Sequence, residues 1–212
     1  MLLRVARTVV VRRQRRSLYS KSLVQEIREL SSTGGKPLQT LRLGEKGAES
    51  FPVMEATNLD GDAVSLPLIF DKRVTMVAIS FRSVGEQALA TWLKPLSERV
   101  VASSRARNHT RLIQLTIIEN SFARFFRSWI LSNLAKLNSH PLATTTHLLR
   151  IGDSETQRNA LRMQNRLAGY VFLVDHNAKV RFHASGAASE DDLKLLFDTT
   201  VDLVAERERL RL

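Results

Sequence analysis

Apolar positions form their clearest strand pattern at residues 169–174, Gly-Tyr-Val-Phe-Leu-Val, a run of apolar, β-branched and aromatic residues after one glycine. The turn-forming residues 175–179 separate this run from a second strand-like run at 180–183. The two runs predict a β-hairpin. The first run has almost no polar alternation, which is typical of a strand covered on both faces, so we expect helices above and below its sheet.

Two further apolar runs, at residues 74–81 and 112–118, are rich in β-branched residues and predict two buried strands. Between them, apolar residues recur at three- and four-residue spacing over 86–101, which predicts a helix. Pro95 lies inside this pattern, so we expect a kink or an early end of the helix there. The order strand, helix, strand predicts parallel pairing with a right-handed crossover.

Residues 120–137 show the most amphipathic helical pattern in the chain. One side carries aromatic residues, and the other carries polar and basic residues such as Arg124 and Arg127. Because a helix on a sheet must bury one face, packing of the aromatic side on the sheet is the favoured prediction. The alternative is an aromatic surface with flanking arginines for a partner helix or an anionic bilayer.

The remaining elements complete a recognisable order. An Asp-Gly turn at 60–61 precedes a short run at 63–66 and predicts a small hairpin or a turn that leads into the first core strand. Residues 148–151 predict a short strand, and helices are expected after Ser154 and from Ser189. A βαβ unit joined to a ββα unit is the thioredoxin-like order. The predicted fold class is therefore α/β, a thioredoxin-like mixed sheet flanked by helices, with an N-terminal extension.

Charge divides the chain into a basic start and a balanced remainder. The formal net charge is +11, yet residues 1–21 hold seven basic residues and no acid, and the first carboxylate is Glu26. An Arg-rich, acid-free segment with interspersed apolar residues is typical of a mitochondrial targeting segment, and the alternative is a nucleic-acid-binding arm. We therefore expect a targeting segment at 1–21, a linker or arm at 22–50 and a thioredoxin-like domain at 51–212.

Composition excludes several classes of function. The 212 residues include no cysteine, which rules out a disulfide scaffold, a thiol nucleophile and cysteine-ligated metal clusters. Every apolar run is interrupted well short of the ~20 residues of a membrane-spanning helix, so we expect no span. The five histidines have no metal-ligand spacing. We accordingly expect no catalytic residue, no cofactor and no metal.

The turn after the first core strand, residues 81–86, is where a thioredoxin places its reactive cysteine at a helix N-terminus. Here Ser83 stands in that turn, and we expect it to cap the helix because no histidine lies near it to act as a base. Thioredoxins also place a cis-proline before the hairpin strand, where this chain has Ala168-Gly169. Both differences favour a scaffold used for binding.

Two arginines are candidates for binding a carboxylate. Arg82 lies in the former active-site turn and Arg181 on the hairpin, and we expect them to lie near each other across the strand ends. The alternative for each is a solvated surface arginine. The complete set of candidate partner-binding residues is Arg82, Phe122, Phe125, Phe126, Trp129, Tyr170 and Arg181.

Several motifs together resemble one family. Residues 77–85 read VAISFRSVG, residues 112–120 read LIQLTIIEN, and residues 160–188 read ALRMQNRLAGYVFLVDHNAKVRFHASGAA. With Phe51-Pro52 at the domain start, this pattern resembles the mitochondrial ATP synthase assembly factor family that acts on membrane subunit a. The resemblance implies a non-catalytic chaperone on the matrix side of the inner membrane, with subunit a as partner and peripheral membrane contact as an additional expectation.

Two other functions stay open at this point. One is a redox-inert accessory subunit of a mitochondrial ribosome or respiratory complex, in which the basic arm and the arginines at 207–211 contact RNA or a neighbouring subunit. Only this alternative would make nucleic acid a partner. The other is a residual peroxidase or glutathione-dependent enzyme, against which the absence of cysteine argues.

Overall fold

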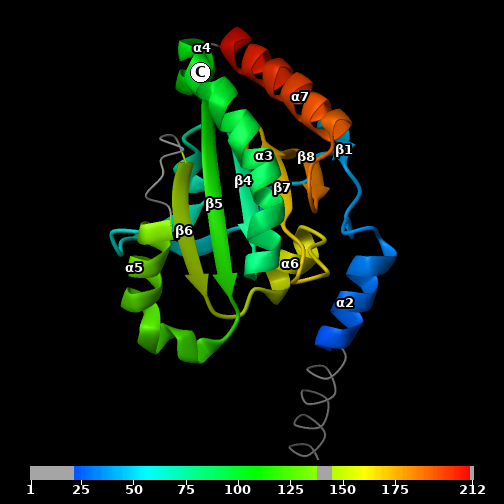
Figure 1. Cartoon of the computed structure of the whole chain (residues 1–212). Coiled ribbons are helices and arrows are strands. Elements are labelled where there is room, and N and C mark those ends of the chain that lie inside the picture. Colours follow the sequence, from blue (N-terminus) through cyan, green and yellow to red (C-terminus); the bar gives the residue numbers. More distant parts are fainter. Residues whose placement is uncertain (1–21, 138–144, 211–212) are drawn as a thin grey trace, which may run out of the picture.

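An eight-stranded mixed sheet runs through the computed structural model, which describes residues 22–137 and 145–210 (Figure 1). The strand order across the sheet is β1-β8-β7-β4-β5-β6-β2-β3. The strands are β1 (Leu41–Arg42), β2 (Met54–Asn58), β3 (Ala63–Leu66), β4 (Val74–Ser80), β5 (Thr110–Ile118), β6 (Thr145–Ile151), β7 (Tyr170–Val174) and β8 (Val180–Ser185). The helices are α2 (Leu23–Ser32), α3 (Ser83–Ala102), α4 (Ser104–His109), α5 (Arg127–Leu137), α6 (Glu155–Ala160) and α7 (Glu190–Arg209), with 3-10 turns η1 (Glu45–Gly47), η2 (Leu68–Phe70) and η3 (Ser121–Phe126).

The centre of the sheet has the predicted topology. β4, β5 and β6 are parallel, and β7 is antiparallel to β4 and to β8, so the βαβ unit and the hairpin meet along β4 and β7. All seven residues of β4 and all five of β7 are buried, because both strands lie inside the sheet and both of their faces are covered. β2 and β3 form the small hairpin expected at the Asp-Gly turn.

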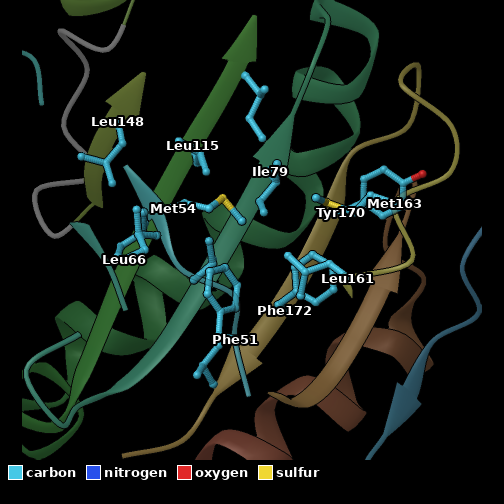
Figure 2. Packing of buried hydrophobic residues seen from close by; sticks show 14 of the residues in the cluster. Phe51, Met54, Leu66, Ile79, Leu115, Leu148, Leu161, Met163, Tyr170 and Phe172 are labelled. Carbon is cyan, nitrogen blue, oxygen red and sulfur yellow. The ribbon is translucent and has the colours of Figure 1, made fainter. Parts of the chain in front are cut away.

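Alternate residues of each strand enter two separate cores. Val77 and Ile79 of β4 face a core that includes Phe51, Tyr170 and Phe172, and Figure 2 shows these aromatic rings gathered over one face of the sheet. The opposite face is covered by helices α3 and α7 (Figure 1), which contribute buried side chains to the second core. That core includes Val74, Met76, Ala78, Leu89, Trp92, Leu96, Phe182, Leu196 and Leu203.

The two faces are covered differently from the prediction of helices on both. On the first face, Phe51, Phe70 and Leu161 come from turns and connecting segments, and α2 contributes only the partly buried Leu30. Large side chains from irregular segments can close a sheet face as well as a helix does, since burial depends on apolar area removed from water. On this face, short segments therefore take the place of long helices.

Helix α3 differs from the sequence prediction at both of its ends. It continues through Pro95 to Ala102, because the apolar residues on either side of the proline, Leu89 and Val100 among them, are buried on the sheet. Burial of several such side chains at ~1.5–3 kcal/mol each outweighs the ~3 kcal/mol that a proline costs inside a helix. At the start, Arg82 occupies the N-cap position, so Ser83 is the first helical residue and not the cap.

Residues 22–50 fold against the domain. Ser22 and Gln25 form a capping box that begins α2, β1 pairs with β8, and Ser50 bridges to Lys179. The segment is an arm with regular structure. The targeting segment expected at residues 1–21 lies outside the described residues. None of the helices in the described part of the chain is both long and apolar enough to cross a bilayer.

Candidate partner-binding site

The carboxyl ends of the parallel strands meet at one edge of the sheet, the lower edge in Figure 1. β4 ends here at the turn to α3, and β5 ends here at Ile118 and is followed by Glu119, Asn120 and η3. β7 begins here at Tyr170. Ligand sites in open α/β sheets lie at this edge, since the loops that follow the strands converge there. This edge also carries α2 and α6.

The start of α3 and the start of β7 are in direct backbone contact at the position of the missing thiol. Gly85 is buried, and a Cβ atom added to it would lie 2.9 Å from the Ala168 carbonyl oxygen. A Cβ atom added to Gly169 would lie 2.5 Å from the Gly85 carbonyl oxygen. No side chain fits between the two backbones. Glycine contact therefore fills the place that a thioredoxin uses for its thiol and cis-proline.

An ion-pair network fastens α2 to this edge. Glu119 accepts hydrogen bonds from Ser154 Oγ (2.6 Å) and Arg158 Nε (2.8 Å), and Arg166 Nε donates to Glu26 Oε1 on α2 (2.7 Å). Glu26 is only 1% exposed, and its hydrogen bond to Arg166 raises the pKa of that guanidinium. The network joins residues 140 positions apart. The sequence did not predict this ion-pair network, because no local pattern around one residue indicates its distant partner.

Tyr170, predicted to contact a partner, is buried. Its hydroxyl donates to the Asn165 carbonyl oxygen (2.8 Å) and accepts from the Asn165 backbone N–H (2.9 Å). Burial is the largest influence on this hydroxyl and raises its pKa. Tyr170 therefore braces the loop before β7, and a partner at the surface would not reach it.

Four aromatic side chains of η3 and α5 lie on the outside of the molecule. Phe122 is 73% exposed, Phe125 84%, Phe126 63% and Trp129 67%, and we call these four residues the aromatic surface. The prediction that they pack on the sheet is wrong. The segment begins as a 3-10 turn, and α5 contacts the domain through Leu131, while Arg127 donates to the Gly61 carbonyl oxygen (2.8 Å). Leu131 and the guanidinium of Arg127 therefore contact the domain, while the four rings stay exposed.

Arg82 and Arg181 lie at opposite edges of the sheet, so their predicted proximity is wrong. Arg82 follows the carboxyl end of β4 and is exposed. Arg181 follows Val180, the first residue of β8, which pairs with Val174 of β7. Val174 in turn pairs with Thr75 near the other end of β4. Arg181 is buried and donates to Asp175 (3.0 Å) and Glu206 (3.4 Å). The two guanidiniums are far apart because β7 runs antiparallel to β4. Short sequence motifs do not predict the direction in which distant strands pair.

The structure also bears on metal binding and on the basic residues near the C-terminus. In the part of the chain that the structure describes, there is no group of three or more histidine, aspartate or glutamate residues that could hold a metal ion. Arg207, one of the basic residues near the C-terminus, donates from Nε to the Lys72 carbonyl oxygen (2.7 Å) and also contacts His109. Its guanidinium is thus engaged within the domain.

Comparison with known protein families shows which family this chain belongs to. A model of the family described as ATP10 protein matches residues 11–203. The chain belongs to the ATP10 protein family. A relative in Candida glabrata, named mitochondrial ATPase complex subunit ATP10, is 22% identical over 196 residues, which cover 90% of this chain and 70% of the relative. The family resemblance found in the sequence is confirmed.

Solved structures confirm the thioredoxin-like fold of this ATP10 family member. A DsbF homologue from Corynebacterium diphtheriae has a TM-score of 0.50 at 10% identity and covers 76% of this chain and 93% of its own. BsSco, of the Sco family of cytochrome c oxidase assembly proteins, has a TM-score of 0.51 at 15% identity and covers 82% and 98%. At these identities the likeness concerns the fold alone.

Proposed function

We propose that this ATP10 family member is a non-catalytic assembly factor for the mitochondrial ATP synthase, which holds the hydrophobic membrane subunit a during its incorporation into the proton channel. The family membership and the name of the Candida glabrata relative support a role at the mitochondrial ATPase. The observation that carries the proposal is the aromatic surface, four large rings exposed to water on one segment. Exposed apolar patches of this kind mark interaction sites.

The aromatic surface suits a very apolar client. Phenylalanine and tryptophan offer a large contact area with few rotatable bonds, so little conformational entropy is lost when they cover an apolar segment. Val84, 53% exposed, and the exposed Arg82 lie at the same edge of the sheet. Polar groups at the rim of an apolar contact keep the protein soluble when the client has left.

The proposed role needs no reaction. The chain has no cysteine, and the contact between Gly85 and the Ala168-Gly169 backbone occupies the place of the redox centre. A fold that carries thiol chemistry in other proteins serves here as a rigid support for the aromatic surface. We further propose that residues 1–21 direct the protein to mitochondria and that it acts on the matrix side of the inner membrane.

Crosslinking in mitochondria tests the client surface. A photoreactive phenylalanine analogue at position 125 is expected to crosslink to newly made subunit a, because Phe125 is the most exposed ring of the aromatic surface. The matched control is the same analogue at Val201 on α7, which is 66% exposed but lies elsewhere. Equal crosslinking from both positions would mean that the aromatic surface has no special role.

Native gels of the ATP synthase test the function itself. Cells without the protein are expected to accumulate ATP synthase that lacks subunit a, and the intact gene should restore it. A variant with Phe125→Ser and Trp129→Ser should fold and still fail to restore assembly. Normal incorporation of subunit a in cells without the protein would disprove the proposed function.

A further inference from the structure

A groove of about 350 Å³ separates η3 and α5 from the sheet on the side that faces the domain. Its apolar floor comes from β2, β3 and β6, and its cations are Arg124, Arg127 and Arg150. We call it the arginine groove. Glu55 is the one carboxylate in its lining, and Oε1 of Glu55 accepts a hydrogen bond from Ser65 (2.7 Å). Three guanidiniums therefore meet one carboxylate in this space.

Backbone carbonyl groups hold the arginines in position. Arg150 donates from Nη1 to the Glu55 carbonyl oxygen (2.8 Å) and from Nη2 to the Asp153 carbonyl oxygen (2.9 Å), and its Nε is buried without a hydrogen-bond partner among the described residues. Arg127 donates to the Gly61 carbonyl oxygen, and Arg124 Nη2 packs close to Gly152. Neutral partners orient a guanidinium without cancelling its charge, unlike the carboxylates that hold Arg166 and Arg181.

The same segment joins this groove to the aromatic surface. Arg124 of η3 and Arg127 of α5 line the groove, and the four exposed rings belong to the same two turns of the chain. Residues 120–137 contain no acidic residue. The segment thus combines cations with exposed rings, and its natural ligand carries an anion attached to an apolar body.

We propose that the arginine groove binds the phosphate of an anionic phospholipid headgroup in a bilayer, while the aromatic surface enters the interfacial layer beside it. Aromatic rings favour the membrane interface, and basic residues near an anionic bilayer strengthen binding. Arginine binds phosphate oxygens with parallel N–H bonds, which fits guanidiniums already held by carbonyl groups. This inference goes beyond the proposed client function and does not require it.

The lipid is favoured over two other anions. A free phosphate ion would use the groove but would leave the four exposed rings without a role. An acidic amphipathic peptide would lay its apolar face into an apolar groove, whereas here three arginines line the groove and the exposed rings are not among its lining. A bilayer offers an anionic phosphate layer for the arginines and an apolar layer beside it for the rings.

Tryptophan fluorescence of the full chain gives a local readout. The chain has two tryptophans, of which Trp92 is fully buried and Trp129 is exposed, so a blue shift and protection from iodide on adding vesicles report on Trp129. A Trp129→Phe variant checks this assignment. The probe is phosphatidylcholine vesicles with and without phosphatidylglycerol. We expect the shift with the anionic vesicles and little with the neutral ones.

Two double variants, each of which removes two positive charges, distinguish binding in the arginine groove from general electrostatic attraction to the vesicles. The double variant Arg124→Gln with Arg127→Gln should raise the vesicle concentration that gives half of the fluorescence shift by at least about tenfold. Each basic residue at an anionic surface strengthens binding by about fivefold. Lys194→Gln with Arg209→Gln removes the same charge from exposed positions on α7 and should change it less than about threefold. Residues 1–21 are unchanged in both double variants, so their positive charges contribute equally to vesicle binding in the two. Arg124→Gln alone, at an exposed side chain, repeats the test without loss of the Arg127 bond to Gly61.

Four outcomes would overturn the proposal. They are an equal loss in both double variants, an equal shift with neutral vesicles, no effect of inorganic phosphate at constant ionic strength, and a Trp129 shift produced by an acidic amphipathic peptide when vesicles produce none. The vesicle assay uses purified protein, so it can fail while crosslinking to subunit a succeeds, and the reverse can also occur.

Discussion

The two tryptophans of this chain lie in helices with similar apolar spacing and have opposite environments. Trp92 of α3 is fully buried, donates from Nε1 to the Gly186 carbonyl oxygen (2.8 Å) and meets the Phe182 ring edge-on at 6.0 Å. Trp129 of α5 is 67% exposed. α3 covers the centre of the sheet, whereas α5 stands beside β6 (Figure 1). The arginine groove lies between α5 and the strands β2, β3 and β6.

The difference shows that aromatic spacing does not distinguish a core helix from a binding helix. The same pattern is buried when the helix crosses central strands that are apolar on both faces, and it turns outward when arginines on the opposite side bond to carbonyl groups of the domain. Stability should therefore depend on α3 and its contacts, and binding on η3 and α5. The following predictions test that division.

Trp92→Ala is expected to have the largest effect on stability. Removing a fully buried indole leaves a cavity and an unpaired Gly186 carbonyl group, which should lower the free energy of unfolding by about 3–5 kcal/mol. Urea denaturation followed by circular dichroism measures it. A loss below about 1 kcal/mol would show that α3 is not the main support of the second core.

Gly169→Ala tests the backbone contact that replaces the redox centre. The new methyl group would overlap the Gly85 carbonyl oxygen and the Leu89 side chain, so α3 or β7 must shift, at a cost of about 1–3 kcal/mol. Thermal and urea unfolding report the change. Gly44→Ala is the matched control, because a methyl group there has no neighbour within 4 Å. Equal stability of the two variants would contradict the close contact.

Asp192→Asn tests the cap of α7 through its pH dependence. Burial would raise the pKa of this carboxyl group, yet hydrogen bonds from Lys36 and Ser189 outweigh burial and lower it. A lowered folded-state pKa gives stability that is complete above the ordinary pKa near 4 and is lost as the pH falls below it. We expect Asp192→Asn to cost about 1–2 kcal/mol near neutral pH.

That cost should shrink as the solution is acidified below about pH 4, because the wild-type protein then loses the same contribution. Chemical denaturation over a series of pH values measures the difference. Asp191→Asn, at the exposed neighbouring position, should leave the pH profile unchanged. A constant difference between Asp192→Asn and wild type at all pH values would contradict the assigned pKa direction.

Trp129→Ala should have the smallest effect on stability. An exposed ring adds little to the folded state, so the free energy of unfolding should change by no more than about 0.5 kcal/mol. The measurement is the same urea titration used for Trp92→Ala, and the variant should bind less of the hydrophobic dye ANS. Destabilisation comparable to that of Trp92→Ala would mean that α5 is part of the core.

Much of the fold could be predicted because it rests on local patterns. The buried strands β4, β5 and β7 carry β-branched and apolar residues along their whole length, and the capping box at Ser189 marks the start of α7. The absence of cysteine likewise predicted a site without thiol chemistry. β1 was not predicted, since two residues of mixed polarity carry little signal until a partner strand pairs with them.

The sequence by itself determined the order of the elements, the hairpin and the residue types available for chemistry, because hydrophobic period and composition act over a few neighbouring residues. Only the tertiary structure decided which side of residues 121–137 faces water, that Tyr170 and Arg181 are buried, and that Arg82 lies far from Arg181. It also brought Gly85 against Gly169 and Glu26 against Arg166. These outcomes depend on contacts between residues distant in the chain, which no local pattern encodes.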